Sequence, residues 1–432
     1  MEQENVVDVI VVGGGAAGLF YAAALGRTVN GVLLEKTKSV GKKLLMSGAG
    51  QCNLTHGGSI KEFLGHYGDK GKQLRTALYK YNNHSVMNFF ESNGVPLFER
   101  EDGKIFPRSL DAREVLDTLV RCGERNGFKI DYHCNVERIE YDGQVYTLFC
   151  GSNGTDKGKS NTYRSKKIVI ATGGCSYPTT GSDGRMFDVL KKMRLDIVSP
   201  KPALVPVSVQ NYPYMELSGI SFPEVKVTVY EASGKDLGVS NTPKKLLEYV
   251  DDLLLTHTNF SGPAILNISR AISTGNSLSV NYLPEKRPEE LLAEMKKAVS
   301  GNSKQVGTFL AEYVNAIDPK RQLPKRFIEL LCQRAGIEPT QKASSLTGDQ
   351  MKKIASLLTN DRFSVSGTGG FQVAMTTAGG VSLEEVDLKT MACKKYPGLY
   401  IIGEALDVDG DTGGYNLQWA FSSAYVAGMG VE

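Results

Sequence analysis

The stretch VDVIVVGGGAAGL, residues 7–19, decides the fold. Its first half is a short β-branched run with almost no polar interruption, as in a parallel strand buried on both faces. Gly13, Gly15 and Gly18 then form G-x-G-x-x-G before an alanine-rich helix, and a second apolar run follows at 32–36. In a Rossmann-like strand–helix–strand unit, these three glycines permit the tight turn, the approach of a pyrophosphate and close helix–strand packing, respectively. The stretch therefore predicts a dinucleotide site.

Three segments further along the chain indicate which dinucleotide binds. Glu35 lies 20 residues after Gly15, where its carboxylate can accept hydrogen bonds from both ribose hydroxyls of an adenosine and would repel a 2′-phosphate. A later strand, IVIATGG, ends at residues 172–173, and a last one is followed by Gly403-Glu404 and by GGYNL at 413–417. A strand ending like the one at 172–173 closes over the dinucleotide in flavoprotein folds, and the segments at 403–404 and 413–417 resemble the one that meets the ribityl chain and flavin ring in two-dinucleotide-fold flavoproteins. Both features favour FAD over NAD. A helix beginning near Asn416 would direct its positive end at the flavin N1–C2=O edge.

Composition limits the partners. Fifty basic residues stand against 47 acidic ones among 432, a balance that argues against a nucleic-acid partner, since those proteins usually carry a concentrated basic stripe. The seven cysteines form no C-x-x-C, and no clustered Cys/His spacing predicts a metal. The first residues are acidic rather than basic, and no apolar stretch reaches about 18 residues. We expect a cytoplasmic protein with a small-molecule substrate and no membrane partner; the sequence does not indicate the oligomeric state.

The character of the chain changes twice. Residues 1–195 and 361–432 have α/β character and predict the Rossmann-like FAD-binding domain. Residues 196–285 carry β alternation and predict a β-rich substrate domain, whereas 286–360 have helical periodicity. The fold class expected is therefore α/β, with a Rossmann-like domain split by an insert that is first β-rich and then helical.

Several blocks in order make the chain recognisable. It resembles the bacterial flavoprotein family that includes the bile-acid dehydro-reductases and the aminoacetone oxidases, and the resemblance covers nearly the whole chain. The matching blocks lie at 13–19, 35–56 (EKTKSVGKKLLMSGAGQCNLTH), 170–184 (IATGGCSYPTTGSDG), 253–270, 368–386 and 397–428. The resemblance implies FAD as cofactor and a β-barrel-like plus helical insert.

The resemblance also implies which residues contact FAD. Within the glycine block these are Gly13, Gly15, Ala16, Ala17 and Gly18; the others are Glu35, Lys36, Lys43, Ser47, Gly48, Cys52, Asn53, Thr172, Gly173, Gly403, Glu404, Gly413, Gly414, Tyr415, Asn416 and Leu417. One block departs from the family pattern SGGGRCN, because Ala49 and Gln51 replace a glycine and an arginine. Losing that arginine removes a fixed positive charge near the flavin or substrate, which bears on the substrate and not on the cofactor.

Three functions are compatible with these features. The first is reduction of a conjugated C=C bond in a hydrophobic ketone, such as a steroid or bile acid, at the expense of NAD(P)H. The second is oxidation of a small amine such as aminoacetone, and the third is a non-catalytic flavin-binding role in regulation or with RNA. No second G-x-G-x-x-G follows a strand, so NAD(P)H would bind transiently as a co-substrate.

Catalytic residues are weakly indicated. Tyr177 follows the turn at 172–173 and could donate a proton to a substrate carbon, although a packing or cofactor-contacting tyrosine is the simpler interpretation. His257 stands in the insert, where a hydrogen-bonded loop histidine is the simpler interpretation. Cys52 lacks a neighbouring second cysteine for disulfide chemistry. The alternating aspartates at 407–411 are expected to shape a loop rather than bind a metal, and Trp419 is expected to pack in a helix.

Overall fold

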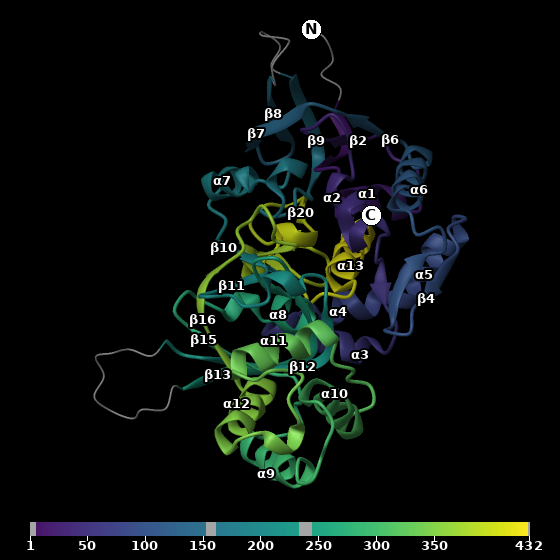
Figure 1. Ribbon diagram of the computed structural model, residues 1–432. Coiled ribbons are helices and arrows are strands. Elements are labelled where there is room, and N and C mark those ends of the chain that lie inside the picture. Colours follow the sequence, from purple (N-terminus) through teal and green to yellow (C-terminus); the bar gives the residue numbers. More distant parts are fainter. Residues whose placement is uncertain (1–5, 153–160, 233–243, 431–432) are drawn as a thin grey trace. The chain divides into compact units, whose positions relative to one another are not determined.

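The computed structural model describes residues 6–152, 161–232 and 244–430, and the chain folds into two compact units. Unit 1 comprises Met1–Ala203 and Gly370–Glu432, and unit 2 comprises Leu204–Gly369. Unit 2 is therefore a single insertion into unit 1. The fold class predicted from the sequence is confirmed, because unit 1 is a Rossmann-like α/β domain and unit 2 contains a closed barrel followed by helices (Figure 1).

The main sheet of unit 1 places its ligand loops at one edge. Its order is β18-β19-β20-β9-β1-β2-β6, and its parallel core is β20 (Leu399–Ile401), β9 (Asn161–Ile170), β1 (Val6–Val12), β2 (Gly31–Leu34) and β6 (Phe128–Asp131). Val12 lies opposite both Leu34 and Ile170, and Ile170 lies opposite Ile401. Because these strands are parallel and end in register, the loops that follow them gather at one edge, where ligands bind in open α/β sheets.

Helices from both ends of the chain pack together in unit 1. The N-terminal α1 (Ala16–Ala24) lies beside the C-terminal α13 (Tyr415–Met429) and beside α6 (Ala112–Arg125) (Figure 1). The other helices are α2 (Lys42–Met46), α3 (Ile60–Phe63), α4 (Gly71–Lys80), α5 (Asn83–Ser92) and α7 (Arg185–Lys192). The remaining strands are β3 (Thr55–His56), β4 (Leu97–Glu99), β5 (Lys104–Pro107), β7 (Cys134–Tyr141), β8 (Tyr146–Ser152), β10 (Ile197–Ala203), β17 (Thr376–Val381), β18 (Val386–Asp387) and β19 (Ala392–Cys393).

Unit 2 is a closed barrel with helices. The barrel order is β11 (Val207–Val209), β14 (Phe260–Ser261), β13 (Lys245–Leu255), β12 (Ser221–Tyr230), β15 (Ser277–Asn281) and β16 (Asp361–Thr368). Its helices are α8 (Pro263–Leu266), α9 (Pro288–Ala298), α10 (Val306–Ile317), α11 (Lys325–Ala335) and α12 (Gly348–Thr359). Apolar residues from the barrel strands and from α9–α12 form one continuous core, so the β-rich and helical segments fold as one unit.

The boundaries of the insert differ from those expected at residues 196 and 361. Strand β10 was expected in the insert, but it pairs with β17 in unit 1. Strand β16 was expected in the Rossmann-like domain, but it pairs with β11 and β15 and closes the barrel. Both differences arise because pairing partners lie far away in sequence. In the part of the chain that the structure describes, no helix is long and apolar enough to cross a membrane.

Candidate cofactor and active site

The three glycines of the first turn are used differently. Gly13 has φ +107°, and a Cβ there would lie 2.6 Å from the Ala171 oxygen. A Cβ on Gly18 would lie 2.0 Å from the Gly13 oxygen, whereas a Cβ on Gly15 would meet nothing within 4 Å. Gly15 is also the N-cap of α1, and no side chain caps that helix end. The first and third glycines are thus required for packing, and the second leaves open backbone at a helix N-terminus, where a phosphate can bind.

Glu35 is held for ligand binding directly after β2. Its side chain is buried, with Oε2 accepting from the Gly14 amide (3.0 Å) and Oε1 accepting from the Thr37 amide (2.8 Å). A carboxylate has about four acceptor positions, so the fixed group keeps the capacity to accept from ribose hydroxyls. The next residue, Lys36, forms an ion pair with Asp183 (2.6 Å).

The segment 47–53 has an unusual backbone. Gly48, Ala49, Gly50 and Cys52 all have positive φ, between 56° and 87°. Left-handed conformations at Ala49 and Cys52 are costly for non-glycine residues, and such strain concentrates at ligand sites. The Ser47 hydroxyl donates to the Leu44 oxygen (2.6 Å), so that side chain is used within its own turn.

Cys52 is a structural thiol. It is completely buried, and burial raises its pKa to about 12. The thiolate is the reactive form of cysteine, so redox or nucleophilic chemistry at Cys52 is not supported.

Two buried polar atoms in these loops have no partner. The Asn53 Oδ1 and Thr172 Oγ1 atoms belong to a set of five buried side-chain polar atoms that make no hydrogen bond in the described part of the chain. An unsatisfied buried polar atom is costly and calls for an explanation such as an absent ligand. Both lie at positions predicted for FAD, together with the open backbone at Gly15 and the fixed Glu35 carboxylate. These residues fit a dinucleotide with hydroxyl, phosphate and ring hydrogen-bonding groups.

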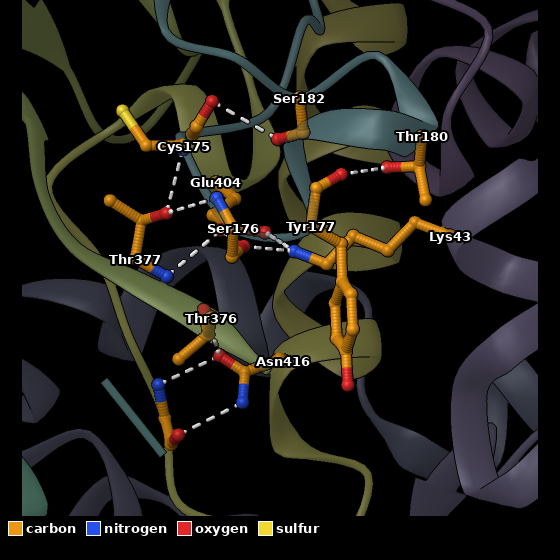
Figure 2. A network of polar contacts seen from close by, with 12 residues as sticks. Lys43, Cys175, Ser176, Tyr177, Thr180, Ser182, Thr376, Thr377, Glu404 and Asn416 are labelled. Carbon is orange, nitrogen blue, oxygen red and sulfur yellow. Dashed lines mark hydrogen bonds and ion pairs between the residues drawn. The ribbon is translucent and has the colours of Figure 1, made fainter. Parts of the chain in front are cut away.

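A polar network connects four separate parts of unit 1, around residues 43, 175–176, 377 and 404 (Figure 2). The Lys43 ammonium donates to the Ser176 hydroxyl and to Glu404 (2.7 Å), and the Ser176 hydroxyl donates to the other Glu404 oxygen (2.7 Å). The Thr377 amide also donates to Glu404 (2.9 Å), and the Thr377 hydroxyl accepts from the Cys175 amide (2.8 Å). Two predicted residues, Lys43 and Glu404, are thus brought together. Ser176 and Thr377 were missed, although both stand in blocks that resemble the family, 170–184 and 368–386; Thr377 lies in strand β17.

The last glycine segment is closed by its own side chains. The Asn416 Oδ1 accepts from the Gly410 amide (2.9 Å), and its Nδ2 donates to the Gly410 oxygen (2.9 Å). Tyr415 is buried and stacks on His66, with ring centroids 3.9 Å apart. These two side chains hold the loop, so a cofactor would meet backbone here. Helix α13 begins at Tyr415 after Gly413 and Gly414, both with positive φ, and partly buried Leu417 packs on the core.

The remaining predicted positions also have defined places. The Gly403 amide donates to the Ser423 hydroxyl (2.9 Å), and its oxygen accepts from the Trp419 indole (3.1 Å), so Trp419 packs within the core as expected. Gly173 has φ +71°, and Ala16 and Ala17 form the first turn of α1. Gly173 and Gly403 thus stand where the backbone needs a positive φ, and Trp419 of α13 anchors the Gly403 loop.

The two catalytic candidates lie in different units. Tyr177 in unit 1 has φ +50°, and its amide donates to the Phe371 oxygen (2.9 Å). Figure 2 shows its ring extending away from the Ser176–Glu404 network, with no contact drawn to its hydroxyl. His257 in unit 2 is exposed on the turn between β13 and β14 and makes no hydrogen bond with the described residues, contrary to the interpretation as a hydrogen-bonded loop histidine. Only Tyr177 belongs to the unit that carries the predicted cofactor loops.

The alternating aspartates connect loops. Asp407 accepts from Lys70 and from the Gly379 amide (2.9 Å), and Asp411 lies 3.1 Å from the His66 Nδ1. Among the described residues, no group of three or more His, Cys, Asp or Glu side chains could hold a metal ion. These contacts account for the aspartates as loop-shaping residues.

An arginine from another loop contacts Gln51, the residue that replaces the arginine of the family pattern. The Arg100 guanidinium donates to the Gln51 Oε1 (2.6 Å) and lies 3.9 Å from the centre of the Phe106 ring. Arg100 comes from the turn between β4 and β5, nearly 50 residues after Gln51. A positive charge is therefore present beside segment 47–53. Sequence reasoning missed it because no motif marks the hairpin.

Known proteins place the chain in a family. The model for the HI0933-like protein Rossmann domain matches residues 7–430. The chain is 32% identical to a ribosomal RNA dihydrouridine synthase from Escherichia coli, over 97% of this chain and 96% of the relative. It is 28% identical to a 3-dehydro-bile acid delta(4,6)-reductase from Clostridium scindens, over 97% of both chains. A solved 3-ketosteroid delta1-dehydrogenase from Sterolibacterium denitrificans has a similar fold, with a TM-score of 0.51, 13% identity and 99% coverage of both chains.

The matched family and the arrangement of unit 1 agree. The Rossmann model spans both parts of unit 1 and the insertion between them. The chain belongs to the HI0933-like family of Rossmann-domain flavoproteins and is an FAD-dependent oxidoreductase.

Proposed function

We propose that this enzyme reduces a C=C bond conjugated to a carbonyl group, with NAD(P)H as the source of electrons. Two observations in unit 1 carry the proposal: Asn53 and Thr172 hold buried polar atoms without a hydrogen-bond partner, and the Tyr177 hydroxyl, on a turn with positive φ, makes no hydrogen bond to the described residues. Reduction of such a bond needs a hydride donor and a proton donor held on one rigid scaffold.

The family relatives support this bond class. Dihydrouridine is uridine whose ring double bond, conjugated to a carbonyl, has been reduced, and the name of the E. coli relative refers to making it. The name of the C. scindens relative refers to reducing double bonds of a 3-dehydro-bile acid, which are conjugated to its ketone. The two names share one chemical change on different molecules, and that change is what we carry to this chain.

Each group in the site has a proposed task. Bound FAD would supply the hydride chemistry. Gly15, Glu35, Asn53 and Thr172 would hold the cofactor through backbone and orphaned polar atoms, with the other predicted contact residues around them. The Lys43–Glu404 pair would keep two opposite charges fixed at the site, which limits reorganisation during the reaction. The Tyr177 hydroxyl would deliver the proton that the reduced substrate needs.

Two substrate classes follow from the relatives. A hydrophobic steroid-like ketone is the first, as the sequence blocks imply. Uridine in ribosomal RNA is the second, and the observation that favours it is the 32% identity to the E. coli relative over nearly the full length. The near-neutral composition argues against extended nucleic-acid binding, so RNA would have to be recognised at few points. All seven cysteines are free thiols, which supports a cytoplasmic location.

The test is a reduction assay under anaerobic conditions. The FAD-loaded protein is mixed with NADH or NADPH, and then with a steroid 4-en-3-one or with ribosomal RNA that lacks dihydrouridine. We expect one nicotinamide to bleach the flavin spectrum and one substrate to restore it, with the reduced product detected by mass spectrometry. Tyr177→Phe should lower kcat by about 100-fold and leave flavin binding unchanged. Bleaching by neither nicotinamide would contradict the proposal.

A further inference from the structure

We infer that Arg100 forms an anion-binding subsite that recognises a carboxylate or phosphate group of the substrate. The inference rests on the proposed function, because it assigns the Arg100 guanidinium to the same active site. It differs in naming the charge of the substrate rather than the bond that is reduced.

The Arg100 guanidinium is held in a defined position. It lies against the face of Phe106, with its central carbon 3.9 Å from the ring centre, and it donates to the Gln51 Oε1 at 2.6 Å. Phe106 is buried, and a Cβ on Gly48 would lie 3.1 Å from its ring. The hairpin thus attaches Arg100 to both ends of the strained turn at residues 48–51. A planar guanidinium fixed on an aromatic face loses little further entropy when it binds an oxyanion.

Arg100 makes no close ion pair with the described residues, although at longer range its charge acts together with the Lys104 hydrogen bonds to lower the pKa of Asp102. Within the described part of the chain, no carboxylate lies within the 4.0 Å that defines an ion pair with it. The carboxylate of the same turn, Asp102, pairs instead with Lys104 (2.6 Å). Three other cations near the predicted cofactor loops are paired with acidic side chains: Lys36 with Asp183, Lys43 with Glu404 and Lys70 with Asp407.

The remaining donors define the ligand. A guanidinium has five N–H groups, and the bond to Gln51 uses one of them. Gln51 is neutral and accepts only through its amide oxygen here, so it orients the guanidinium without cancelling its charge. The free part of the fork matches the two oxygens of a carboxylate or a phosphate, which an arginine binds in bidentate geometry. The shared chemistry is an oxyanion on a substrate whose reducible part enters the flavin site.

Two pairs of probes distinguish the sources of that oxyanion. The first pair is a steroid 4-en-3-one with a carboxylate side chain and its methyl ester, and the second is uridine 5′-monophosphate and uridine. Binding to the FAD-loaded full chain is measured by calorimetry, and reduction is measured separately as KM and kcat. The variants are Arg100→Gln and Arg100→Lys, with Arg108→Gln as the matched control, because Arg108 is exposed close by in sequence and carries the same charge.

We expect Arg100→Gln to weaken binding of one anionic probe by about tenfold or more, the loss of a charge-assisted hydrogen bond, with no change for its neutral partner. Arg100→Lys should restore part of this affinity, and Arg108→Gln should change nothing. In the assay, KM should rise and kcat should hold. An equal loss for charged and neutral probes, a loss in Arg108→Gln of the same size, or no binding of either anion by the wild type would overturn the inference.

Failure of the proposed function gives a different result. If no probe is reduced but Arg100→Gln still weakens binding of an anion selectively, the bond class is wrong and the anion subsite stands. If a probe is reduced and Arg100→Gln leaves its KM and Kd unchanged, the subsite is wrong and the proposed function stands. Thermal unfolding of each variant shows whether the turn at 48–51 is intact.

Discussion

Two buried polar clusters of this molecule are built in opposite ways. In unit 2, Arg334 makes two hydrogen bonds of 2.7 Å to Asp361, which also accepts from Tyr214, and the Tyr282 hydroxyl donates to Tyr214 (3.0 Å). Burial raises the pKa of Tyr214 and of Tyr282 well above the ordinary value, so both hydroxyls keep their protons. In unit 1, by contrast, the loops hold orphaned oxygens at Asn53 and Thr172.

We infer that the unit 2 cluster stabilises the fold, whereas the unsatisfied atoms of unit 1 bind a ligand. A buried network whose members satisfy one another stabilises one arrangement of the chain, and breaking it leaves an unpaired charge. A cluster with unsatisfied atoms and a strained backbone lowers the stability of the free protein, and a ligand can recover that energy. Mutations in the unit 2 cluster should therefore lower the free energy of unfolding, whereas mutations of the unit 1 polar atoms should weaken the affinity for FAD.

The largest effect on stability is expected in unit 2. Arg334→Met leaves the Asp361 carboxylate, 3% exposed, without its ionic partner. We expect a loss of about 3–5 kcal/mol in the free energy of unfolding, measured by urea denaturation. Flavin affinity of the folded fraction should be unchanged. A loss below about 1 kcal/mol would show that water or another group replaces the arginine, and it would weaken the contrast between the clusters.

The next prediction uses two glycines of one turn. Gly15→Ala adds a methyl group where nothing lies within 4 Å, so stability should hold while the Kd for FAD rises by about 100-fold because the pyrophosphate is displaced. Gly18→Ala places a Cβ 2.0 Å from the Gly13 oxygen and should cost about 1–3 kcal/mol of stability. Flavin fluorescence titration and thermal unfolding measure the two. If both variants changed stability and the Kd for FAD to the same extent, the role assigned to Gly15 in FAD binding would be wrong.

A smaller effect tests one orphaned atom directly. Thr172→Val removes a hydroxyl that has no partner and keeps the shape of the side chain. The free protein should become slightly more stable, by up to about 1 kcal/mol, and the Kd for FAD should rise by about tenfold. Stability is followed by denaturant unfolding in the absence of flavin. A clear loss of stability without flavin would mean that the hydroxyl is satisfied in the free protein.

The smallest effect concerns the thiol in segment 47–53. Burial holds the pKa of Cys52 at about 12, so the thiolate is almost absent at pH 8. In the native protein, iodoacetamide should leave Cys52 unmodified by peptide mass spectrometry, and Cys52→Ser should retain flavin. Rapid labelling of Cys52 would show that the loop opens and that its strain is not maintained.

The sequence predicts the Rossmann-like domain well because its signal is local. The run at 7–19 contains the strand, the turn and the helix start in consecutive residues, and Glu35 follows at the expected spacing. The barrel boundaries are harder, because β16 belongs to the barrel only through pairing with β11 and β15, more than 80 residues earlier for β15.

The site illustrates the same limit at the level of side chains. Lys43 and Glu404 stand in motifs, so the sequence indicates both of them, although only the fold shows that they pair across 361 residues. Ser176, in the turn after β9, and Thr377, in β17, join the network through contacts that only the fold brings about, and Arg100 reaches Gln51 from a hairpin with no motif. The sequence around such a residue does not indicate which distant residue it will contact.

The central claim is that unit 1 completes its polar cluster with FAD. The most direct measurement is the flavin released from purified full-length protein on denaturation, identified by chromatography and quantified against protein concentration. We predict one FAD per chain, retained through gel filtration, and rebinding to the flavin-free protein with a rise in thermal stability. A protein that holds no flavin and whose unfolding temperature is unaffected by added FAD would contradict the account.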